Sequence, residues 1–452
     1  MKKIAEKLWC RLSPVAIALV ACSSAALSPA AHAADLTPTS QESVYFRGWP
    51  FTPEIVTDNV DRYNREQKGH VDYATVTHGD YPTLMEKALI AKDKLDIIYA
   101  NPPTAVRFLE AGWTLPANDI PNFQAALDDM YPNVKDAWTY KGKILGMSYF
   151  LSTRGMMMVN MKRQKEAGVD KQQPKNWDEF YAQILELNKK GVKDVYLPHW
   201  FNEFYGISWA FVWEVLNRGG HIIDSKTFAP QLDAAGPAGK TLDAWKAIFN
   251  AKIVPQEVLS YNEGSLVEGF GSGRYLYSTQ AAYQLAVLND PAKSKIAGSV
   301  SFLPYQGASW GLLDSALYLR TARARSPALD EDVKRFQSWY GYKDQNGKAA
   351  VGQRWAETSM LFSGYKSVME NPATEAAYKK NLAKPDDYQA LLKVYANTPA
   401  PDFWKTIWAE EFNSFLRQRL GQFLLNNEPS ANVIKDMNEK INQLNKKYKM
   451  TK

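Results

Sequence analysis

The order of apolar and polar residues after position 40 switches between two periods. The short apolar runs that predict strands lie at 43–46, 71–76 and 95–100. The segments whose apolar residues recur at helical spacing, and so predict helices, lie at 54–66, 81–91 and 104–111. The run at 95–100 is nearly all apolar, which is typical of a strand buried on both faces. Strands that alternate with helices at this spacing indicate an α/β layer with parallel strands.

The rest of the chain contains further elements of both kinds. Extended segments are predicted at 144–149, 155–160, 300–304 and 312–319. Helices are predicted within 174–191 and at 206–217, 236–251 and 432–448, and the sequence after Leu329 is mostly helical. The sequence has no internal repeat and no long Gly/Ser linker. Two α/β lobes that share one chain therefore fit better than a string of separate domains.

The first 33 residues differ in character from the rest. Their basic residues are Lys2, Lys3, Lys7 and Arg11. A mostly apolar, small-residue stretch follows at 14–27, and Ala31-His32-Ala33 offers small residues where a signal peptidase reads. This pattern predicts a secretory signal peptide that is cleaved after Ala33. The alternative is a lipoprotein, because Leu19-Val20-Ala21-Cys22 resembles a lipoprotein box that would leave a lipidated Cys22.

Composition excludes several classes of protein. The chain has 452 residues, of which 45% are hydrophobic and 23% are charged, so it fits two to three ordered domains and not a disordered protein. No apolar run long enough to span a membrane occurs outside the N-terminus. The net charge of +6 includes four basic residues and one acidic residue of the leader. The remaining excess of basic residues is too small to indicate nucleic-acid binding.

Motifs for catalysis and metal binding are incomplete. Gly307-Ala308-Ser309-Trp310-Gly311 matches G-x-S-x-G, and Asp314 could serve as the acid, but no histidine follows His221. We therefore interpret the motif as a glycine-containing loop. The sequence contains no H-E-x-x-H, and both cysteines lie in the leader, so no metal and no cofactor are predicted. The possibility of a glycosidase with a pair of catalytic carboxylates stays open, because such carboxylates need not be close in sequence.

Aromatic residues are the unusual feature of the composition. The chain has 14 tryptophans, and many fall in predicted loops or helix starts. Flat aromatic faces complement the C–H faces of sugar rings, while polar side chains satisfy the hydroxyls, whose unpaired burial costs about 1–3 kcal/mol each. Each single tryptophan is more simply explained by core packing. The excess of aromatic residues nevertheless favours carbohydrate binding.

An ordered set of segments resembles one known family. Tyr140–Tyr149, with the sequence YKGKILGMSY, is similar to the "dGKiyGlPy" segment of family 1 extracellular solute-binding proteins of ABC importers. The other segments that resemble this family, in order, are at 95–98, 111–116, 158–160, 166–169, 174–180 and 269–274. They keep the family's order and spacing across nearly the whole chain after the leader.

The resemblance implies a fold and a domain division. The expected fold is the two-lobed periplasmic-binding-protein fold of type II, in which each lobe is a mainly parallel sheet flanked by helices and hinge crossovers join the lobes. Lobe one would contain residues 34–147 and 305–361. Lobe two would contain residues 148–304 and 362–452. The ligand would be held between them.

Candidate ligand-binding residues follow from strand ends and from the resemblance. Ligands in α/β folds bind beyond the carboxyl ends of parallel strands, which in lobe one are followed by Trp49, Asp80, Tyr81 and Asn101. The hinge exit adds Tyr149 and Arg154. The resemblance to maltose-binding relatives adds the lobe-two and return-loop residues Trp209, Gln280, Tyr283, Trp310 and Trp404.

The predicted function is carbohydrate capture for an ABC importer. The partners would be a small carbohydrate and the permease subunits in the inner membrane, and the location would be the periplasm. Two alternatives stay open. The same fold could bind a non-sugar solute, where a carboxylate-rich cleft would indicate a polyamine and an Arg/Lys-rich cleft a phosphate ester. The protein could also be a secreted hydrolase.

Overall fold

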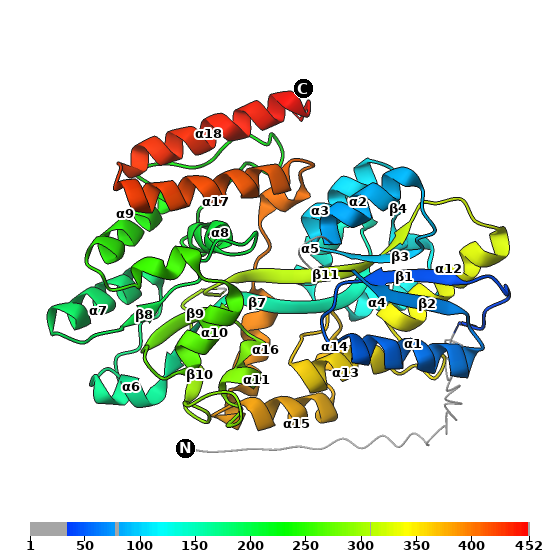
Figure 1. The fold of residues 1–452 in the computed structure, drawn as a ribbon, viewed down its shortest axis with the longest axis horizontal. Coiled ribbons are helices and arrows are strands. Elements are labelled where there is room, and N and C mark those ends of the chain that lie inside the picture. Colours follow the sequence, from blue (N-terminus) through cyan, green and yellow to red (C-terminus); the bar gives the residue numbers. More distant parts are fainter. Residues whose placement is uncertain (1–33, 77–80, 308, 451–452) are drawn as a thin grey trace, which may run out of the picture. The chain divides into compact units, whose positions relative to one another are not determined.

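One nine-stranded sheet extends through the protein (Figure 1). The computed structural model describes residues 34–76, 81–307 and 309–450. The strands are β1 (Val44–Gly48), β2 (Val71–Thr75), β3 (Ile97–Ala100), β4 (Thr114–Leu115), β5 (Thr139–Tyr140), β6 (Lys143–Ile144), β7 (Met147–Asn160), β8 (Tyr196–Leu197), β9 (Tyr277–Ala281), β10 (Val300–Phe302) and β11 (Leu312–Thr321). Strands β5 and β6 form a separate two-stranded sheet.

Helices cover this sheet. The α-helices before residue 300 are α1 (Pro53–Gln67), α2 (Tyr81–Ala91), α3 (Pro102–Glu110), α4 (Phe123–Asp129), α5 (Pro132–Trp138), α6 (Met161–Glu166), α7 (Trp177–Lys189), α8 (Ile207–Asn217), α9 (Pro237–Asn250), α10 (Glu263–Gly271) and α11 (Gln284–Leu288). Those after residue 300 are α12 (Pro327–Gly341), α13 (Ala350–Ser359), α14 (Lys366–Met369), α15 (Pro372–Asn381), α16 (Tyr388–Asn397), α17 (Ala409–Asn426) and α18 (Ser430–Lys447). Short 3₁₀ helices are η1 (Ala117–Asp119), η2 (Gln256–Ser260), η3 (Pro385–Asp387) and η4 (Asp402–Lys405).

Two long strands connect the two halves of the sheet. The order is β2-β1-β3-β11-β7-β9-β8, so β11 and β7 lie at the centre, and both run across the middle of Figure 1. Strand β11 pairs with β7 through most of its length and with β3 through Leu317–Arg320. Nearly every residue of both strands is buried, as expected for central strands covered on both faces.

Parallel pairing is confined to the outer strands. Strand β1 pairs parallel with β2 and β3 in one half, and β8 pairs parallel with β9 in the other. The crossing strands β7 and β11 run antiparallel to their neighbours, because each carries the chain from one half to the other. The α/β class predicted from the sequence is confirmed. The predicted lobe boundaries remain a proposal, since β7 and β11 belong to both halves of the sheet.

Local sequence determines where the helices around the cavity begin. Asn101 caps α3, because its side-chain oxygen accepts a hydrogen bond from the Thr104 amide, and Pro102 and Pro103 then occupy the first turn. Asn262 caps α10 in the same way through the Ser265 amide. The helix start at Asn262 places Glu263 in the first turn of α10, where the helix dipole favours an anion.

The C-terminal helices pack against helices α8 and α9 of the second half. Helix α17 contacts α8 and α18, and α18 contacts α9, so these four helices pack together as one group (Figure 1). The amphipathic pattern that predicts a helix over 432–448 is confirmed, since Val433, Met437, Ile441 and Leu444 are its buried face. Among the described residues, no helix combines the length and the apolar character needed to cross a membrane.

Candidate ligand-binding cavity

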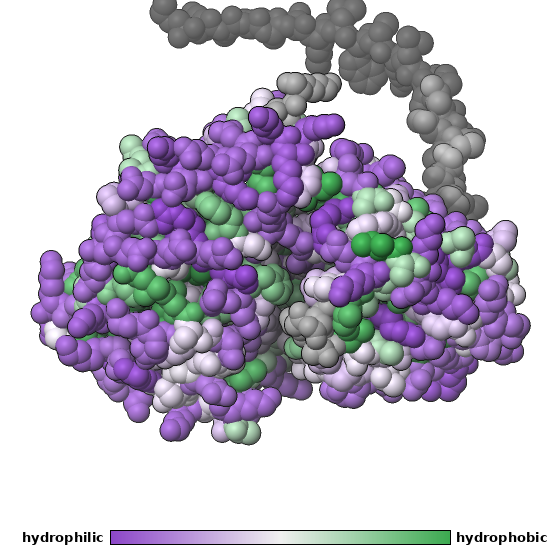
Figure 2. All heavy atoms as spheres, turned by 45° about the horizontal axis from the view of Figure 1, so that its top comes forward, coloured by the Kyte–Doolittle hydropathy of each residue, from purple (hydrophilic) through white to green (hydrophobic). Residues whose placement is uncertain are grey.

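A cavity of about 590 Å³ is lined by residues from both halves of the sheet. Figure 2 shows the surface hollowed between the two halves. The first half contributes Trp49, Pro50, Phe51, Tyr81, Pro82, Met85, Tyr99, Ala100, Asn101, Thr104 and Phe108. The crossing strands and the second half contribute Phe150, Arg154, Phe204, Tyr205, Trp209, Glu263, Glu268, Tyr283, Gln284, Asp314 and Ser315, among others. A ligand in this cavity would therefore touch both halves.

The first half presents aromatic rings held in fixed positions. The Trp49 ring lies 5.3 Å from the ring of Tyr81 and 4.7 Å from that of Tyr99, measured between ring centres. The Tyr81 hydroxyl accepts a hydrogen bond from the Tyr99 amide at 2.7 Å and donates one to the Arg47 carbonyl at 3.0 Å. Because this hydroxyl is engaged with the backbone, Tyr81 offers its ring to the cavity.

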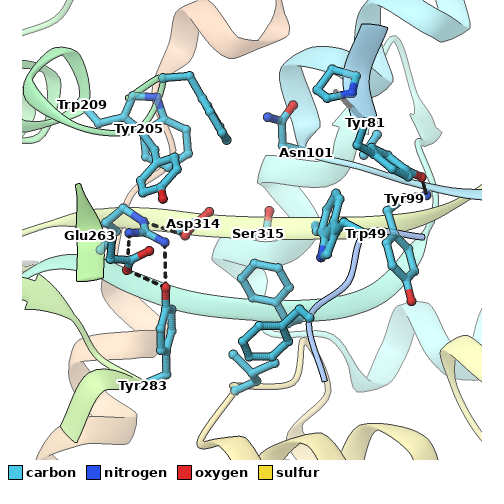
Figure 3. Close-up of a pocket in the computed structure, with 18 of the residues that line it drawn as sticks. Trp49, Tyr81, Tyr99, Asn101, Tyr205, Trp209, Glu263, Tyr283, Asp314 and Ser315 are labelled. Carbon is cyan, nitrogen blue, oxygen red and sulfur yellow. Dashed lines mark hydrogen bonds and ion pairs between the residues drawn. The ribbon is translucent and has the colours of Figure 1, made fainter. Parts of the chain in front are cut away.

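The second half presents a facing aromatic group. Phe204, Tyr205 and Trp209 lie in the loop before α8 and in its first turn. Trp209 packs against Trp404, with 4.8 Å between the ring centres, and Phe204 is 42% exposed. Figure 3 shows Tyr205 and Trp209 on one side of the cavity, with Trp49, Tyr81 and Tyr99 on the other. Rings on opposite walls are suited to hold a flat ligand between them.

A charged cluster occupies the second-half end of the cavity. The Arg154 guanidinium donates from Nε to Asp314 Oδ2 at 2.8 Å, from Nη1 to Glu263 Oε1 at 3.0 Å and from Nη2 to the Tyr283 hydroxyl at 3.1 Å. The Tyr283 hydroxyl donates in turn to Glu263 Oε1 at 2.7 Å. The guanidinium carbon lies 4.5 Å from the centre of the Tyr205 ring. The cluster is thus held by strands β7 and β11, helix α10 and the Tyr205 ring (Figure 3).

The two carboxylates of the cluster differ in acidity. Burial acts to raise the pKa of Glu263, but Arg154 and the Tyr283 hydroxyl outweigh it and hold that pKa at about 2. Burial raises the pKa of Asp314 above its usual value, even though Arg154 acts to lower it. The difference follows from the contacts, because Glu263 receives hydrogen bonds from three side chains and Asp314 from one.

Six of the candidate residues predicted from the sequence line the cavity. They are Trp49, Tyr81, Asn101, Arg154, Trp209 and Tyr283. They come from six separate stretches of the chain, and the fold brings them together around one space. Asp80 lies outside the described residues.

Four other candidates lie in the core. Tyr149 stacks on Tyr99 with 4.5 Å between ring centres, behind the cavity wall. Gln280 is fully buried in β9, where its amide donates to the Ser278 hydroxyl. Trp310 packs against Trp177 and donates to the Leu303 carbonyl. Trp404 supports Trp209 from behind. Each of these rings or amides is used for packing, and none is among the residues that line the cavity.

Several cavity residues were not predicted from the sequence. Tyr99, Tyr205 and Glu263 line the cavity without belonging to a motif, and Asp314 was considered solely as the acid of a hydrolase. The sequence around Glu263 does contain the pattern of a helix N-terminus, since Asn262 is a good N-cap residue and an acidic residue follows it. That pattern predicts the helix but not the direction in which its first turn points.

The serine of the G-x-S-x-G match is not a nucleophile in this structure. Ser309 is fully buried, and its hydroxyl oxygen accepts a hydrogen bond from the Gly311 amide at 3.1 Å. A nucleophilic serine must be exposed and activated by a base, and the buried Ser309 does not meet the first of these conditions. Within the described part of the chain, no group of three or more His, Cys, Asp or Glu side chains is arranged to hold a metal ion.

Comparison with known proteins identifies the family. The sequence profile of the bacterial extracellular solute-binding protein family matches residues 51–417. The chain belongs to this family. The predicted family resemblance is confirmed, and the hydrolase alternative is rejected, since the members of the family are binding proteins and not enzymes. No curated protein gives a significant match.

Solved structures share the fold at low sequence identity. A T. maritima protein solved with maltose bound has a TM-score of 0.71 and 16% identity, over 89% of this chain and 99% of its own. The cyclic alpha-maltosyl-1,6-maltose binding protein of Arthrobacter globiformis has a TM-score of 0.70 and 16% identity, over 89% and 98%. A solute-binding protein of Agrobacterium vitis S4 with bound D-mannitol has a TM-score of 0.69 and 15% identity, over 90% and 99%. These likenesses confirm the two-lobed fold.

Proposed function

We propose that this protein is the substrate-binding component of an ABC importer and that it captures a carbohydrate in the cavity between its lobes. The observation that carries the proposal is the pair of facing aromatic walls, Trp49 and Tyr81 on one side and Tyr205 and Trp209 on the other. Such faces match the C–H faces of sugar rings. The structures that share the fold were solved with maltose or D-mannitol bound, or are described as binding a cyclic maltosyl saccharide, which supports the same ligand class.

The proposed location is the periplasm, with delivery of the ligand to permease subunits in the inner membrane. The N-terminal pattern of a signal peptide ending at Ala33 supports export. The family consists of extracellular solute-binding proteins, which agrees with that location. Lipidation at Cys22 remains the alternative form of the exported chain.

A phosphate ester is disfavoured as the ligand. Arg154 is the one Arg, Lys or His side chain among the described residues that line the cavity, and two carboxylates already pair with it. A phosphate would need free cations or amide donors around it. The three carboxylates that line the cavity favour a polyamine as the second candidate ligand.

A thermal-shift screen tests the proposal. A ligand that binds the folded protein raises the unfolding midpoint by mass action, so the expected result is a concentration-dependent rise with one or more saccharides or polyols. Spermidine and glycerol 3-phosphate serve as the cationic and anionic comparison compounds. A rise with spermidine and none with any saccharide or polyol would reject carbohydrate capture.

A further inference from the structure

Carboxylates outnumber cations on the described wall of the cavity. Glu263, Asp314 and Glu268 are the acidic residues of that wall, and Arg154 is its one basic residue. Glu268 is exposed at the rim, where water screens it, whereas the side chains of Glu263 and Asp314 are 19% and 8% exposed. The inner cluster therefore has two carboxylates for one guanidinium.

Arg154 is already paired with two carboxylates of the protein. Its Nε, Nη1 and Nη2 atoms each donate to a protein oxygen, and the Tyr205 ring covers one face of the guanidinium. These bonds use three of the five guanidinium N–H groups, and an anionic ligand group that reached the other two would lie beside Glu263 and Asp314. Repulsion from these carboxylates therefore disfavours an anion at this end of the cavity.

The Glu263 carboxylate has one oxygen without a protein donor. The hydrogen bonds that Glu263 receives from Arg154, Tyr283 and Gln284 all end on Oε1. Asp314 is bonded through Oδ2, to Arg154. Asp314 also accepts a hydrogen bond from the Ser315 backbone amide. In the described part of the chain, Oε2 of Glu263 accepts no hydrogen bond from another side chain or from the backbone, so this oxygen on the cavity wall is available to a ligand.

The charge of this cluster favours a cation over a neutral hydrogen-bond donor. With both carboxylates ionised, the cluster carries one negative charge more than the guanidinium balances, and the burial of that charge is costly. The raised pKa of Asp314 reflects this cost, and a ligand cation beside it would favour its ionised form. A ligand hydroxyl supplies a hydrogen bond but no charge. A protonated amine supplies up to three donors together with a positive charge, and the neighbouring rings of Tyr205 and Tyr283 also favour a cation.

From this geometry we propose that the captured carbohydrate is an amino sugar, whose ammonium group lies against Asp314 and Glu263 while its ring lies between the aromatic walls. This inference rests on the proposed function, because it takes the ligand to be a saccharide. It also accounts for both features of the cavity at once, since a plain sugar leaves the carboxylates without a cation and a polyamine leaves the aromatic walls without a ring face.

Isothermal titration calorimetry with matched pairs of saccharides tests the inference. Each pair shares one skeleton and differs in one group: glucosamine and glucose, galactosamine and galactose, and the β-1,4 disaccharides of glucosamine and of glucose. N-acetylated forms provide a neutral control for the size of the substituent. We expect the amino form of the best-binding pair to bind about tenfold more tightly than its neutral partners, since a charge-assisted hydrogen bond is roughly twice as strong as a neutral one.

Variants assign the effect to the cluster. Asp314→Asn removes one of the two carboxylate charges but keeps the shape of the side chain, so the ratio of the affinities for the amino and neutral forms should fall to about twofold or less. Asp136→Asn is the matched control, because Asp136 lies on α5 outside the cavity and its side chain is 79% exposed. We expect Asp136→Asn to keep the full preference.

Each outcome decides between the two proposals. If neutral saccharides bind as tightly as their amino forms, or more tightly, the amino-sugar inference is overturned and carbohydrate capture stands. If spermidine binds and no saccharide of either kind does, carbohydrate capture itself fails. If Asp314→Asn keeps the full preference, the ammonium does not lie at the cluster and the inference is overturned. The comparison of matched pairs on the unmodified protein needs no variant, so it remains decisive even if Asp314→Asn does not fold.

Discussion

Trp49 illustrates how a single residue forms a rigid binding face. It follows the last residue of β1, and its ring contacts those of Tyr81, Tyr99 and Tyr149. These contacts fix the orientation of the indole, while the rest of the ring is part of the cavity wall. A ligand that stacks on Trp49 therefore loses little free energy to ordering of the side chain.

Replacement of Trp49 should weaken ligand binding. Trp49→Ala removes one aromatic face, and we expect the binding free energy to fall by about 1–3 kcal/mol, as for other aromatic anchor residues. The measurement is calorimetric titration with the saccharide that gives the largest thermal shift. Phe415→Ala is the control, since Phe415 is also partly buried but packs on Phe412, and neither ring is among the cavity residues. Equal affinities of the Trp49 and Phe415 variants would contradict the stacking role.

Glu214 carries a pH dependence of stability that is independent of the cavity. It is buried in α8, where Tyr181 donates to its carboxylate oxygens at 2.9 Å and Trp245 donates at 2.8 Å. Burial raises the pKa of Glu214 from its usual 4.5 to about 8, although Arg218 and these donors act to lower it. The folded protein therefore holds a proton on Glu214 that the unfolded chain releases.

The proton on Glu214 determines how the free energy of unfolding changes with pH. Because the folded-state pKa lies above the unfolded value, the stabilisation is fully present below about pH 4.5 and is lost as the pH rises through about 8. The free energy of unfolding, measured in urea at a series of pH values, should decrease across this window. Glu214→Gln cannot titrate, so its decrease should be smaller. Parallel curves for the two proteins would show that Glu214 is not the group responsible.

Residue types alone do not reveal which aromatic side chains line a cavity. Trp49 and Trp209 line it, but Trp310 and Trp404 are buried and do not, and nothing in the local sequence separates the two pairs. The predictions at strand ends were more reliable, because the carboxyl ends of parallel strands meet at one edge of a sheet, and Trp49 and Asn101 follow β1 and β3 directly.

At the scale of elements, the contact between β7 and β11 determines where the charged cluster lies. Arg154 pairs with Leu312 across these strands, and Gly311 precedes β11 at the same level. A Cβ atom on Gly311 would lie 1.8 Å from the Arg154 carbonyl oxygen, closer than any real contact. A glycine at 311 therefore allows the two strands to approach and holds the Arg154 backbone in place.

Two glycine substitutions should act in opposite directions. Gly311→Ala forces the strands apart and should lower the free energy of unfolding by about 1–3 kcal/mol, as other overpacked sites do. Gly421→Ala, within α17, meets no atom within 4 Å of the added Cβ and should raise it by about 0.5–1 kcal/mol. Urea denaturation measures both. A stable Gly311→Ala protein would mean that the strands tolerate a wider separation than the structure allows.

The sequence predicted elements best where one periodicity applied throughout. Helix α2 has the predicted limits of 81–91, and α7 and α9 lie within the predicted segments. Strand β7 was predicted as two extended segments, at 144–149 and 155–160, but it is continuous from Met147 to Asn160. The residues between those segments include Arg154, and a charged residue at this position predicts a loop. In the structure Arg154 is buried within the strand, because Asp314 and Glu263 pair with it.

At the scale of the whole molecule, two long strands join two halves around one cavity. Strands β7 and β11 cross between the halves, so they would be the hinge of a rotation of one half against the other. In such a rotation, the two cavity walls lie farther apart in an open form and closer together in a closed form. A ligand that contacts both walls favours the closed form by the difference between its affinities for the two forms. The fold could be predicted from the ordered set of family-like segments. The charge of the cavity could not, because Glu263 and Asp314 are 51 positions apart in the printed sequence.

Native mass spectrometry of the purified protein tests the central claim most directly. The protein is incubated with a pool of neutral and amino saccharides, freed of unbound compounds, and measured intact; the retained ligand is then released and its mass determined. We expect one saccharide per chain, released with its mass unchanged. Retention of no saccharide, or release of the saccharide in cleaved form, would contradict the account of this protein as a carrier that binds a carbohydrate between its two lobes and delivers it unaltered.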